Sequence, residues 1–118
     1  MPWEYNQTSG TLSHNGRVVA HGYSGAGAGR NNPQMQNVHN VGPIPVGAYT
    51  VGGAYNTRTH GPHVMRLTPQ GHNSLGRSGF LMHGDNRTHT ASEGCIIMPR
   101  NIRNQVSNSH DNALEVTR

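Results

Sequence analysis

The residues best suited to chemistry lie in one short stretch of the chain, from His83 to Cys95. A cysteine thiol becomes a nucleophile when a nearby base takes its proton, and an imidazole commonly serves as that base. His83 closes one apolar run, and Cys95, the single cysteine, opens the next. Gly84 and Gly94 let backbone approach a substrate closely, and the N–H groups near Gly94 and Cys95 are candidate donors to an oxyanion.

By itself, a histidine that precedes a cysteine is a weak signal of catalysis. The chain contains nine histidines, so one of them falls near the cysteine easily by chance. Ile96 and Ile97 follow Cys95 and suit a buried, inert thiol in an apolar strand. If Cys95 is catalytic, its thiol should react with iodoacetamide well below the pH of ~8.5 at which an ordinary cysteine ionises. Residue types alone leave both the nucleophile and the packed structural thiol open.

Composition narrows the classes of protein to which the chain can belong. It has 118 residues, of which 31% are hydrophobic and 12% charged. We expect a single domain over residues 1–118 with one modest core. The net charge is +4, and all nine basic residues are arginines spread along the chain. Nucleic-acid surfaces combine clustered basic residues with aromatic ones. Aromatic residues make up only 5% here, so nucleic acid is not an expected partner.

The chain lacks the sequence features of membrane insertion and of a cleaved leader. No apolar run approaches the ~18 residues of a membrane-spanning helix, so no span is expected. Residues 1–5 have neither the basic nor the apolar region of a secretory signal. We therefore expect the protein to stay in the cytosol or to leave the cell without a cleaved signal. A single cysteine also excludes an internal disulfide.

Short apolar clusters separated by glycine, proline and asparagine predict strands joined by loops. Asn15-Gly16 predicts a type I′ turn in a hairpin over residues 11–20. The glycine-rich run 22–33 predicts a long mobile loop. Further strands are predicted after the prolines at 43 and 45, and at 64–68, 77–83, 95–98 and 114–116.

One short helix is predicted after the cysteine. Pro99 suits a first helical position, and Ile102 and Val106 lie four residues apart, the spacing of neighbours on one helix face. The fold class is therefore mainly β with a single short amphipathic helix.

Several motifs together resemble a known family. His83-Gly84 followed by Ser92-Glu93-Gly94-Cys95 resembles the active-site signature of the L,D-transpeptidase catalytic domain, and Pro45, Gly47 and Tyr49 match that family's Pro-x-Gly-x-aromatic strand. The chain is more similar still to a smaller branch, the type VI secretion effectors with L,D-transpeptidase-like domains that attack the peptidoglycan of rival bacteria. This similarity spans nearly the whole chain and is carried by residues 22–25, 31–33, 42–47, 76–78 and 83–85.

The resemblance implies a fold and a set of roles. The fold is a compact L,D-transpeptidase-like β-sandwich or barrel, and no cofactor is expected. Cys95 is the nucleophile, His83 the general base, and the carbonyl of Gly84 orients the imidazole. Gly94 and Cys95 supply the oxyanion donors, and Ser92 lines the cleft. The implied reaction passes through a thioester on Cys95, formed from a peptidoglycan stem tetrapeptide.

The chain departs from the wider family at two positions beside the cysteine. Glu93 stands where the family usually has histidine, and Ile97 stands where it usually has arginine. The spacing from histidine to cysteine is also short. The missing arginine leaves the binding of a substrate carboxylate unassigned, and Arg77, Arg100 and Arg103 are the candidates to supply that charge.

Other polar residues admit two interpretations each. Tyr23 and the glycine-rich loop form either a cover over the substrate or a plain connection. Asp85 either orients His83 or holds its own loop. Glu93 either contacts substrate amines or is a solvated loop carboxylate. The sequence His60-Gly61-Pro62-His63 hints at a metal, but its Gly-Pro is not helical and no cluster completes a tetrahedral set, so no metal is expected.

The expected activity is L,D-carboxypeptidase, L,D-transpeptidase in the form of D-amino acid exchange, or both. Two alternatives remain: another cysteine peptidase or amidase of the cell wall, and a non-catalytic peptidoglycan-binding module. In the familiar Cys/His amidases the cysteine precedes the histidine, the reverse of the order here. The implied partners are stem peptides, a cognate immunity protein and a secretion-machine component. The implied location is the periplasm of the target bacterium, reached by type VI secretion.

Overall fold

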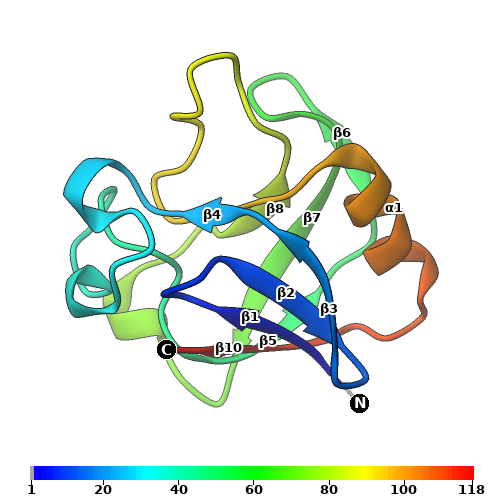
Figure 1. The fold of residues 1–118 in the computed structure, drawn as a ribbon, viewed down its shortest axis with the longest axis horizontal. Helices are drawn as coiled ribbons and strands as arrows, with labels where there is room; N and C mark the ends of the chain where they lie inside the picture. The colour runs from blue at the N-terminus through cyan, green and yellow to red at the C-terminus, as the bar shows by residue number, and fades with distance from the viewer. Residues whose placement is uncertain (1) are drawn as a thin grey trace.

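The computed structural model describes residues 2–118 and is built mainly of strands (Figure 1). The strands are β1 (Trp3–Asn6), β2 (Thr11–His14), β3 (Arg17–His21), β4 (Tyr23–Ser24), β5 (Gly47–Val51), β6 (Tyr55–Thr57), β7 (Gly61–Gln70), β8 (Leu81–His83), β9 (Ile96–Ile97) and β10 (Ala113–Thr117). The helices of the described residues are α1 (Arg100–Asn108) and the 3-10 turns η1 (Gly27–Gly29), η2 (Pro33–Met35) and η3 (Ser74–Gly76). The predicted class, mainly β with one short helix after the cysteine, is confirmed.

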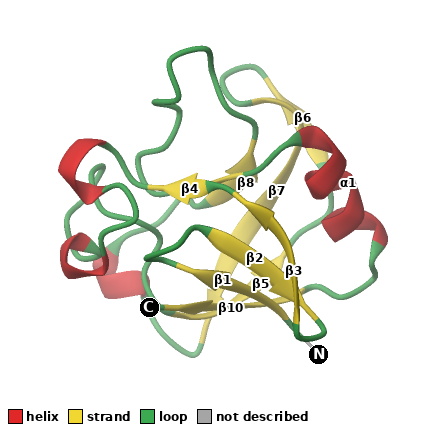
Figure 2. Ribbon diagram, viewed as in Figure 1, coloured by secondary structure: helices red, strands yellow, loops and turns green. Residues whose placement is uncertain are grey.

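The strands form a sheet that curls until its two edges meet (Figure 2). Its order is β3-β2-β1-β10-β5-β7-β8-β9-β4, with β6 paired to β7. The outermost strands, β3 and β4, are separated in the chain only by Gly22, so one continuous segment forms both edges. A side chain does not fit at this crossing, because a Cβ on Gly22 would lie 1.9 Å from the carbonyl oxygen of Ile97.

The hydrophobic core fills the inside of the curled sheet and includes Tyr5, Leu12, Tyr49, Met65 and Leu114, each at most 2% exposed. Burial of this apolar surface is the main favourable contribution to folding. The core fixes the sheet that carries His83 and Cys95.

The helix α1 covers one side of the core with Ile102 and Val106, as their spacing predicted. Pro99 is not its first residue. Its backbone is extended, with ψ at 159°, and it precedes the helix. No helix in residues 2–118 has the length and apolar character needed to cross a membrane.

The hairpin prediction is confirmed: β2 and β3 pair antiparallel, and Asn15 and Gly16 both have the positive φ that a type I′ turn needs. The run 22–33, predicted as a loop, is partly regular structure. It begins with β4 and contains η1, and backbone bonds from Asn31 to Ser24 (2.9 Å) and within η1 fix its course. β1 and β6 were not anticipated, and β7 is longer than its predicted core at 64–68.

Candidate active site

The two parallel strands β8 and β9 bring the predicted catalytic pair to one face of the sheet. Met82 lies opposite Ile96 in this ladder, and both are in the core. Because side chains alternate along a strand, the neighbouring residues His83 and Cys95 point away from the core on the opposite face. Both line one cavity of about 790 Å³. Residues of the loop between the two strands, 84–95, and of the β6–β7 turn line this cavity, and Figure 1 shows the course of both segments.

His83 is held in the orientation of a base. Its Nδ1 lies 2.8 Å from the carbonyl oxygen of Gly84, and a carbonyl only accepts, so Nδ1 carries the proton and Nε2 carries the lone pair. Nε2 is buried and has no hydrogen-bond partner among residues 2–118. Burial lowers the pKa of His83, while the Gly84 carbonyl acts in the opposite direction. The ring is therefore neutral near pH 7 and able to accept a proton.

Cys95 rests as a neutral thiol. Its Sγ accepts a hydrogen bond from the N–H of Leu81 at 3.3 Å and lies 3.9 Å from the carbonyl oxygen of Gly79, a weak acceptor contact for the S–H. Burial raises the pKa of the thiol, and the Glu93 carboxylate raises it further. No hydrogen bond joins Cys95 to His83 in the part of the chain that the structure describes. This direction of the pKa is opposite to the early ionisation that the sequence analysis expects of a catalytic thiol.

Alkylation of Cys95 should therefore begin at higher pH than alkylation of a free thiol. We expect the iodoacetamide rate of the wild-type protein to have its midpoint above that of N-acetylcysteine measured alongside. Glu93→Gln should lower the midpoint, because it removes a negative charge that disfavours the thiolate. The rates are read by intact mass over a pH series. A wild-type midpoint at or below that of the free thiol would show that a thiolate is already stabilised at rest.

Ser92 was expected to line the cleft, but it does not line the cavity. Its side chain shapes the turn before the nucleophile instead. It is fully buried. Its Oγ accepts from the N–H of Gly25 (2.9 Å) and of Gly94 (3.1 Å) and donates to the carbonyl of Cys95 (2.6 Å). Since the Gly94 N–H is engaged by Ser92, it is not free to bind an oxyanion, and the Cys95 N–H stays the candidate donor of the two.

Arg77 connects several backbone segments beside the nucleophile through hydrogen bonds. It is 5% exposed and donates four hydrogen bonds to backbone carbonyls, those of Gln36 (2.6 Å), Pro43 (2.8 Å), Gly42 (3.0 Å) and Glu93 (3.2 Å). A guanidinium has five N–H donors, so these bonds leave one for a substrate carboxylate, and Arg77 lines the cavity of Cys95. Gly94 must be glycine here, because a Cβ would lie 2.5 Å from Arg77 Nη2.

Comparison with models of protein families assigns the chain to a family. A family model described as the Tlde1 domain matches residues 18–117, which contain the whole cavity just described. The chain belongs to the Tlde1 domain family. This is a family of type VI effector domains that are L,D-transpeptidase-like, so the predicted effector branch is confirmed. Membership of the wider L,D-transpeptidase superfamily stays a prediction. No curated protein sequence matches the chain.

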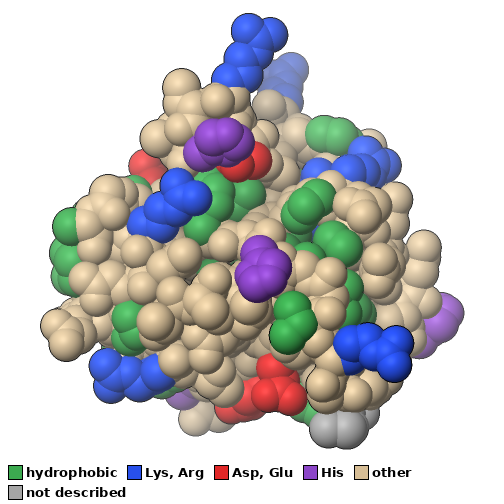
Figure 3. Space-filling model, viewed as in Figure 1, with side chains coloured by type: hydrophobic (Ala, Val, Ile, Leu, Met, Phe, Trp, Pro, Cys, Tyr) green, Lys and Arg blue, Asp and Glu red, His purple; other side chains and the backbone are tan. Residues whose placement is uncertain are grey.

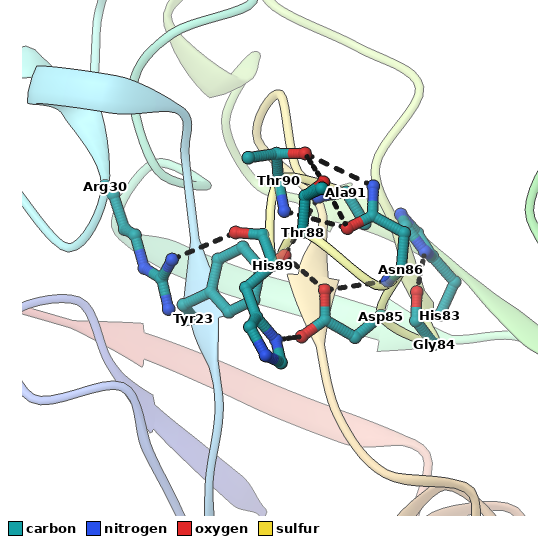
Figure 4. A network of polar contacts seen from close by, with 10 residues as sticks. All are labelled: Tyr23, Arg30, His83, Gly84, Asp85, Asn86, Thr88, His89, Thr90 and Ala91. Carbon is teal, nitrogen blue, oxygen red and sulfur yellow. Dashed lines mark hydrogen bonds and ion pairs between the residues drawn. The ribbon is translucent and has the colours of Figure 1, made fainter.

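In this Tlde1 domain, Tyr23 and Asp85 pin the loop that follows the histidine (Figure 4). The Tyr23 hydroxyl donates to Asp85 Oδ1 at 2.6 Å and accepts from the N–H of Ala91 at 2.9 Å. Asp85 also accepts from the N–H of Asn86 (2.8 Å) and contacts His89 Nδ1 (2.7 Å). Partial desolvation opposes its ionisation, but these bonds together lower the pKa of Asp85. Of the two interpretations of Asp85, the contacts match the loop-holding one.

The remaining predicted binding residues are divided between two cavities. Glu93 is exposed and lines the cavity that contains Cys95. Arg100 and Arg103 line a second cavity instead, together with Tyr23 and Asp85. These two arginines therefore do not face Cys95 directly.

Two residues that contact predicted site residues of this Tlde1 domain were not among the predicted site residues. His60 lines the cavity, and its ring centroid lies 4.6 Å from that of His83; sequence reasoning considered it only for metal binding. Within residues 2–118, no group of three His, Cys, Asp or Glu side chains is arranged to hold a metal ion. Arg30 stacks over the Tyr23 ring, 3.8 Å from its centroid. No local signal marks either residue, because each contact depends on a distant segment.

Proposed function

We propose that this Tlde1 domain is a cysteine enzyme acting on peptidoglycan stem tetrapeptides. It would release the terminal D-alanine as an L,D-carboxypeptidase, or replace it with another D-amino acid. One observation carries the proposal. His83 and the Cys95 thiol line the same cavity, the buried Nε2 of His83 has no hydrogen-bond partner within residues 2–118, and the Gly84 carbonyl fixes the other ring nitrogen. A thiol and a neutral imidazole with an unused ring nitrogen in one cavity are the two groups that acyl transfer by a cysteine requires.

The first half of the reaction forms the thioester. His83 Nε2 takes the thiol proton as Cys95 Sγ attacks the carbonyl carbon between the L-centre of diaminopimelate and D-alanine. The carbonyl becomes an oxyanion, for which the Cys95 N–H is the candidate donor. When the tetrahedral intermediate collapses, the C–N bond breaks and the imidazolium gives its proton to the departing amine. D-alanine leaves, and the tripeptide stays bound to Sγ.

The second half of the reaction releases the tripeptide. His83 takes a proton from water, the hydroxide attacks the thioester, and the C–S bond breaks. The proton returns to sulfur, so both catalytic residues are regenerated. If the amine of a D-amino acid attacks in place of water, the product is an exchanged tetrapeptide. The high thiol pKa and low imidazole pKa favour proton transfer during attack over an ion pair at rest.

The acid limb of the pH–rate profile should lie below pH 6.5. Only neutral His83 accepts a proton, and burial lowers its pKa from the ordinary 6.5, with His60 and Arg103 lowering it further and Gly84 and Asp85 opposing. The value of kcat/KM should therefore hold as the pH falls through 6.5 and drop only in more acidic solution. In His60→Gln the limb should move to higher pH, because one repelling group is lost. A limb that stays in place would exclude His60 as an influence on the base.

The proposal is tested by incubating the wild-type protein with purified muropeptides and reading the products by mass. The expected products are tripeptides and free D-alanine, or exchanged tetrapeptides when a D-amino acid is supplied. Untouched tetrapeptides would refute the mechanism, and cleavage of another bond would indicate a different wall peptidase or amidase. The raised pKa of Cys95 favours one alternative, a non-catalytic module. That module would bind muropeptides and leave them intact.

The family assignment supports a setting for this activity. A type VI effector domain is secreted and meets peptidoglycan in the periplasm of another cell, and we propose this location for the reaction. A producing cell must then protect its own wall, which we expect an immunity protein to do by blocking the cavity of Cys95. Co-purification with the product of a neighbouring gene, and loss of tetrapeptide cleavage in that complex, would support this expectation.

A further inference from the structure

A second cavity of about 450 Å³ adjoins the cavity of Cys95. The two share Gly84 and Asp85 in their linings, so the start of the 84–95 loop forms a wall common to both. The second cavity is strongly basic, because Arg30, Arg100 and Arg103 all line it. In Figure 3, arginine side chains (blue) and hydrophobic side chains (green) lie around the upper part of the visible face.

Arg103 is the innermost of these charges. It is 6% exposed, and its Nε and Nη1 donate to the carbonyls of Met98 (3.0 Å), Pro62 (2.8 Å) and His63 (2.9 Å). No hydrogen bond from its Nη2 is present within residues 2–118. Nη2 lies against Gly84, where an added Cβ would come within 2.9 Å of it. A buried guanidinium thus keeps unused donors beside the wall between the cavities.

The other two arginines also retain free donors. Arg100 uses its Nε for Asn104 at 3.3 Å, which leaves its two terminal nitrogens for a ligand. Arg30 donates from Nη1 to the carbonyl of His89 at 3.0 Å while it lies on the Tyr23 ring (Figure 4). Both side chains are exposed and have unused N–H groups.

The electrostatic field in the second cavity favours the binding of an anion. Burial lowers the pKa of Arg103, and the neighbouring Arg100 lowers it further, so a negative group between them relieves their repulsion. The helix α1 begins at Arg100 without a side-chain cap, and a helix N-terminus carries partial positive charge. The carboxylate of Asp85 also lines the cavity, but its oxygens are engaged by Tyr23, Asn86 and His89.

We propose that the second cavity binds a carboxylate of the stem peptide whose scissile bond lies beside Cys95. Guanidinium groups match the planar, two-oxygen geometry of a carboxylate. Because Gly84 and Asp85 line both cavities, we assign the bound carboxylate to a part of the peptide close to the reacting bond. This inference rests on the proposed function and adds the part of the substrate that the cysteine cavity does not hold. Arg30, which sequence reasoning missed, is then a specificity-determining residue.

The test measures binding without turnover. Full-length Cys95→Ala protein is titrated calorimetrically with the stem tetrapeptide, and Arg30→Gln and Arg100→Gln are added singly on that background. Each arginine substitution should weaken binding about tenfold, the equivalent of one charged hydrogen bond. Arg17→Gln is the matched control, because Arg17 is exposed and lines neither cavity. Its affinity should equal that of the parent.

Peptides in which single carboxylates are amidated identify the bound group. Amidating the group that the cavity holds should weaken binding to the parent by a similar factor and cause little further loss in the arginine variants. The D-glutamate and diaminopimelate carboxylates are amidated in separate peptides, so the two sources are told apart. Unchanged affinity in both arginine variants, equal affinity for all amidated peptides, or no binding to the parent would each overturn the inference.

Turnover by the wild-type protein is measured separately. Arginine-dependent binding with no cleavage would refute the proposed activity and leave the carboxylate site standing. Cleavage with unchanged affinity in the arginine variants would refute the carboxylate site and leave the proposed activity standing.

Discussion

Replacing Cys95 with alanine is expected to lower the release of D-alanine from tetrapeptides by at least about 10³-fold, because no other group can form the thioester. The side chain that is removed is small and lies at the cavity, where its Sγ accepts one weak bond from Leu81. The fold should therefore tolerate the change. Activity is measured as free D-alanine over time, at equal concentrations of folded protein.

The control for this variant is its stability. Thermal unfolding of Cys95→Ala should stay close to that of the wild type, so that lost activity is assigned to lost chemistry. Cleavage of tetrapeptides by folded Cys95→Ala at the wild-type rate would mean that the nucleophile lies elsewhere, or that a contaminant performs the reaction.

Replacing His83 with glutamine is expected to lower kcat/KM by about 10²- to 10⁴-fold, the usual contribution of a general acid–base group. Glutamine is close to histidine in size and stays polar, but its amide cannot take a proton from the thiol. The value is measured with the same tetrapeptide and compared with binding to the variant, which should be nearly unchanged. A loss confined to substrate affinity would assign His83 to binding.

The same variant distinguishes two kinds of cysteine site. Since no hydrogen bond joins the resting Cys95 thiol to His83 within residues 2–118, the pH midpoint of Cys95 alkylation should barely move in His83→Gln. In a site with a thiolate–imidazolium pair at rest, the midpoint would rise strongly, because the thiolate would lose its cationic partner. A strong rise would therefore contradict the neutral resting pair described above.

The features that sequence predicted well are those set by neighbours in the chain. The Asn15-Gly16 turn depends on the φ preferences of its own two residues, and the helix depends on Ile102 and Val106 four positions apart. The features that were missed depend on distant partners. β1 pairs with β10 from the other end of the chain, and a strand as short as β4 exists only because β9 lies beside it.

The same distinction explains the corrections at the site. Ser92 stands in a motif that suggests a place in the cleft, but its hydroxyl is taken by Gly25, a residue from a remote segment. Charge alone does not show whether an arginine is free: most donors of Arg77 are occupied by carbonyls of Gln36, Gly42 and Pro43. Only the folded backbone decides which polar groups remain for a ligand.

The folded chain supplies positive charge near the position of the missing arginine. Ile97, the position where the wider family usually has an arginine, lines the second cavity together with Arg30, Arg100 and Arg103. Positive charge is therefore present around Ile97, supplied by the glycine-rich segment and by α1. Sequence reasoning identified two of these three arginines but could not place them on the same side of the 84–95 loop.

The central claim, that Cys95 carries the acyl group, is tested most directly by quenching the wild-type protein within milliseconds to seconds of adding tetrapeptide and recording its intact mass. The predicted result is a gain equal to the tetrapeptide minus D-alanine, located on the peptide that contains Cys95 and removed by hydroxylamine. Protein that stays unmodified while tripeptide accumulates, or an adduct on any other residue, would contradict the mechanism.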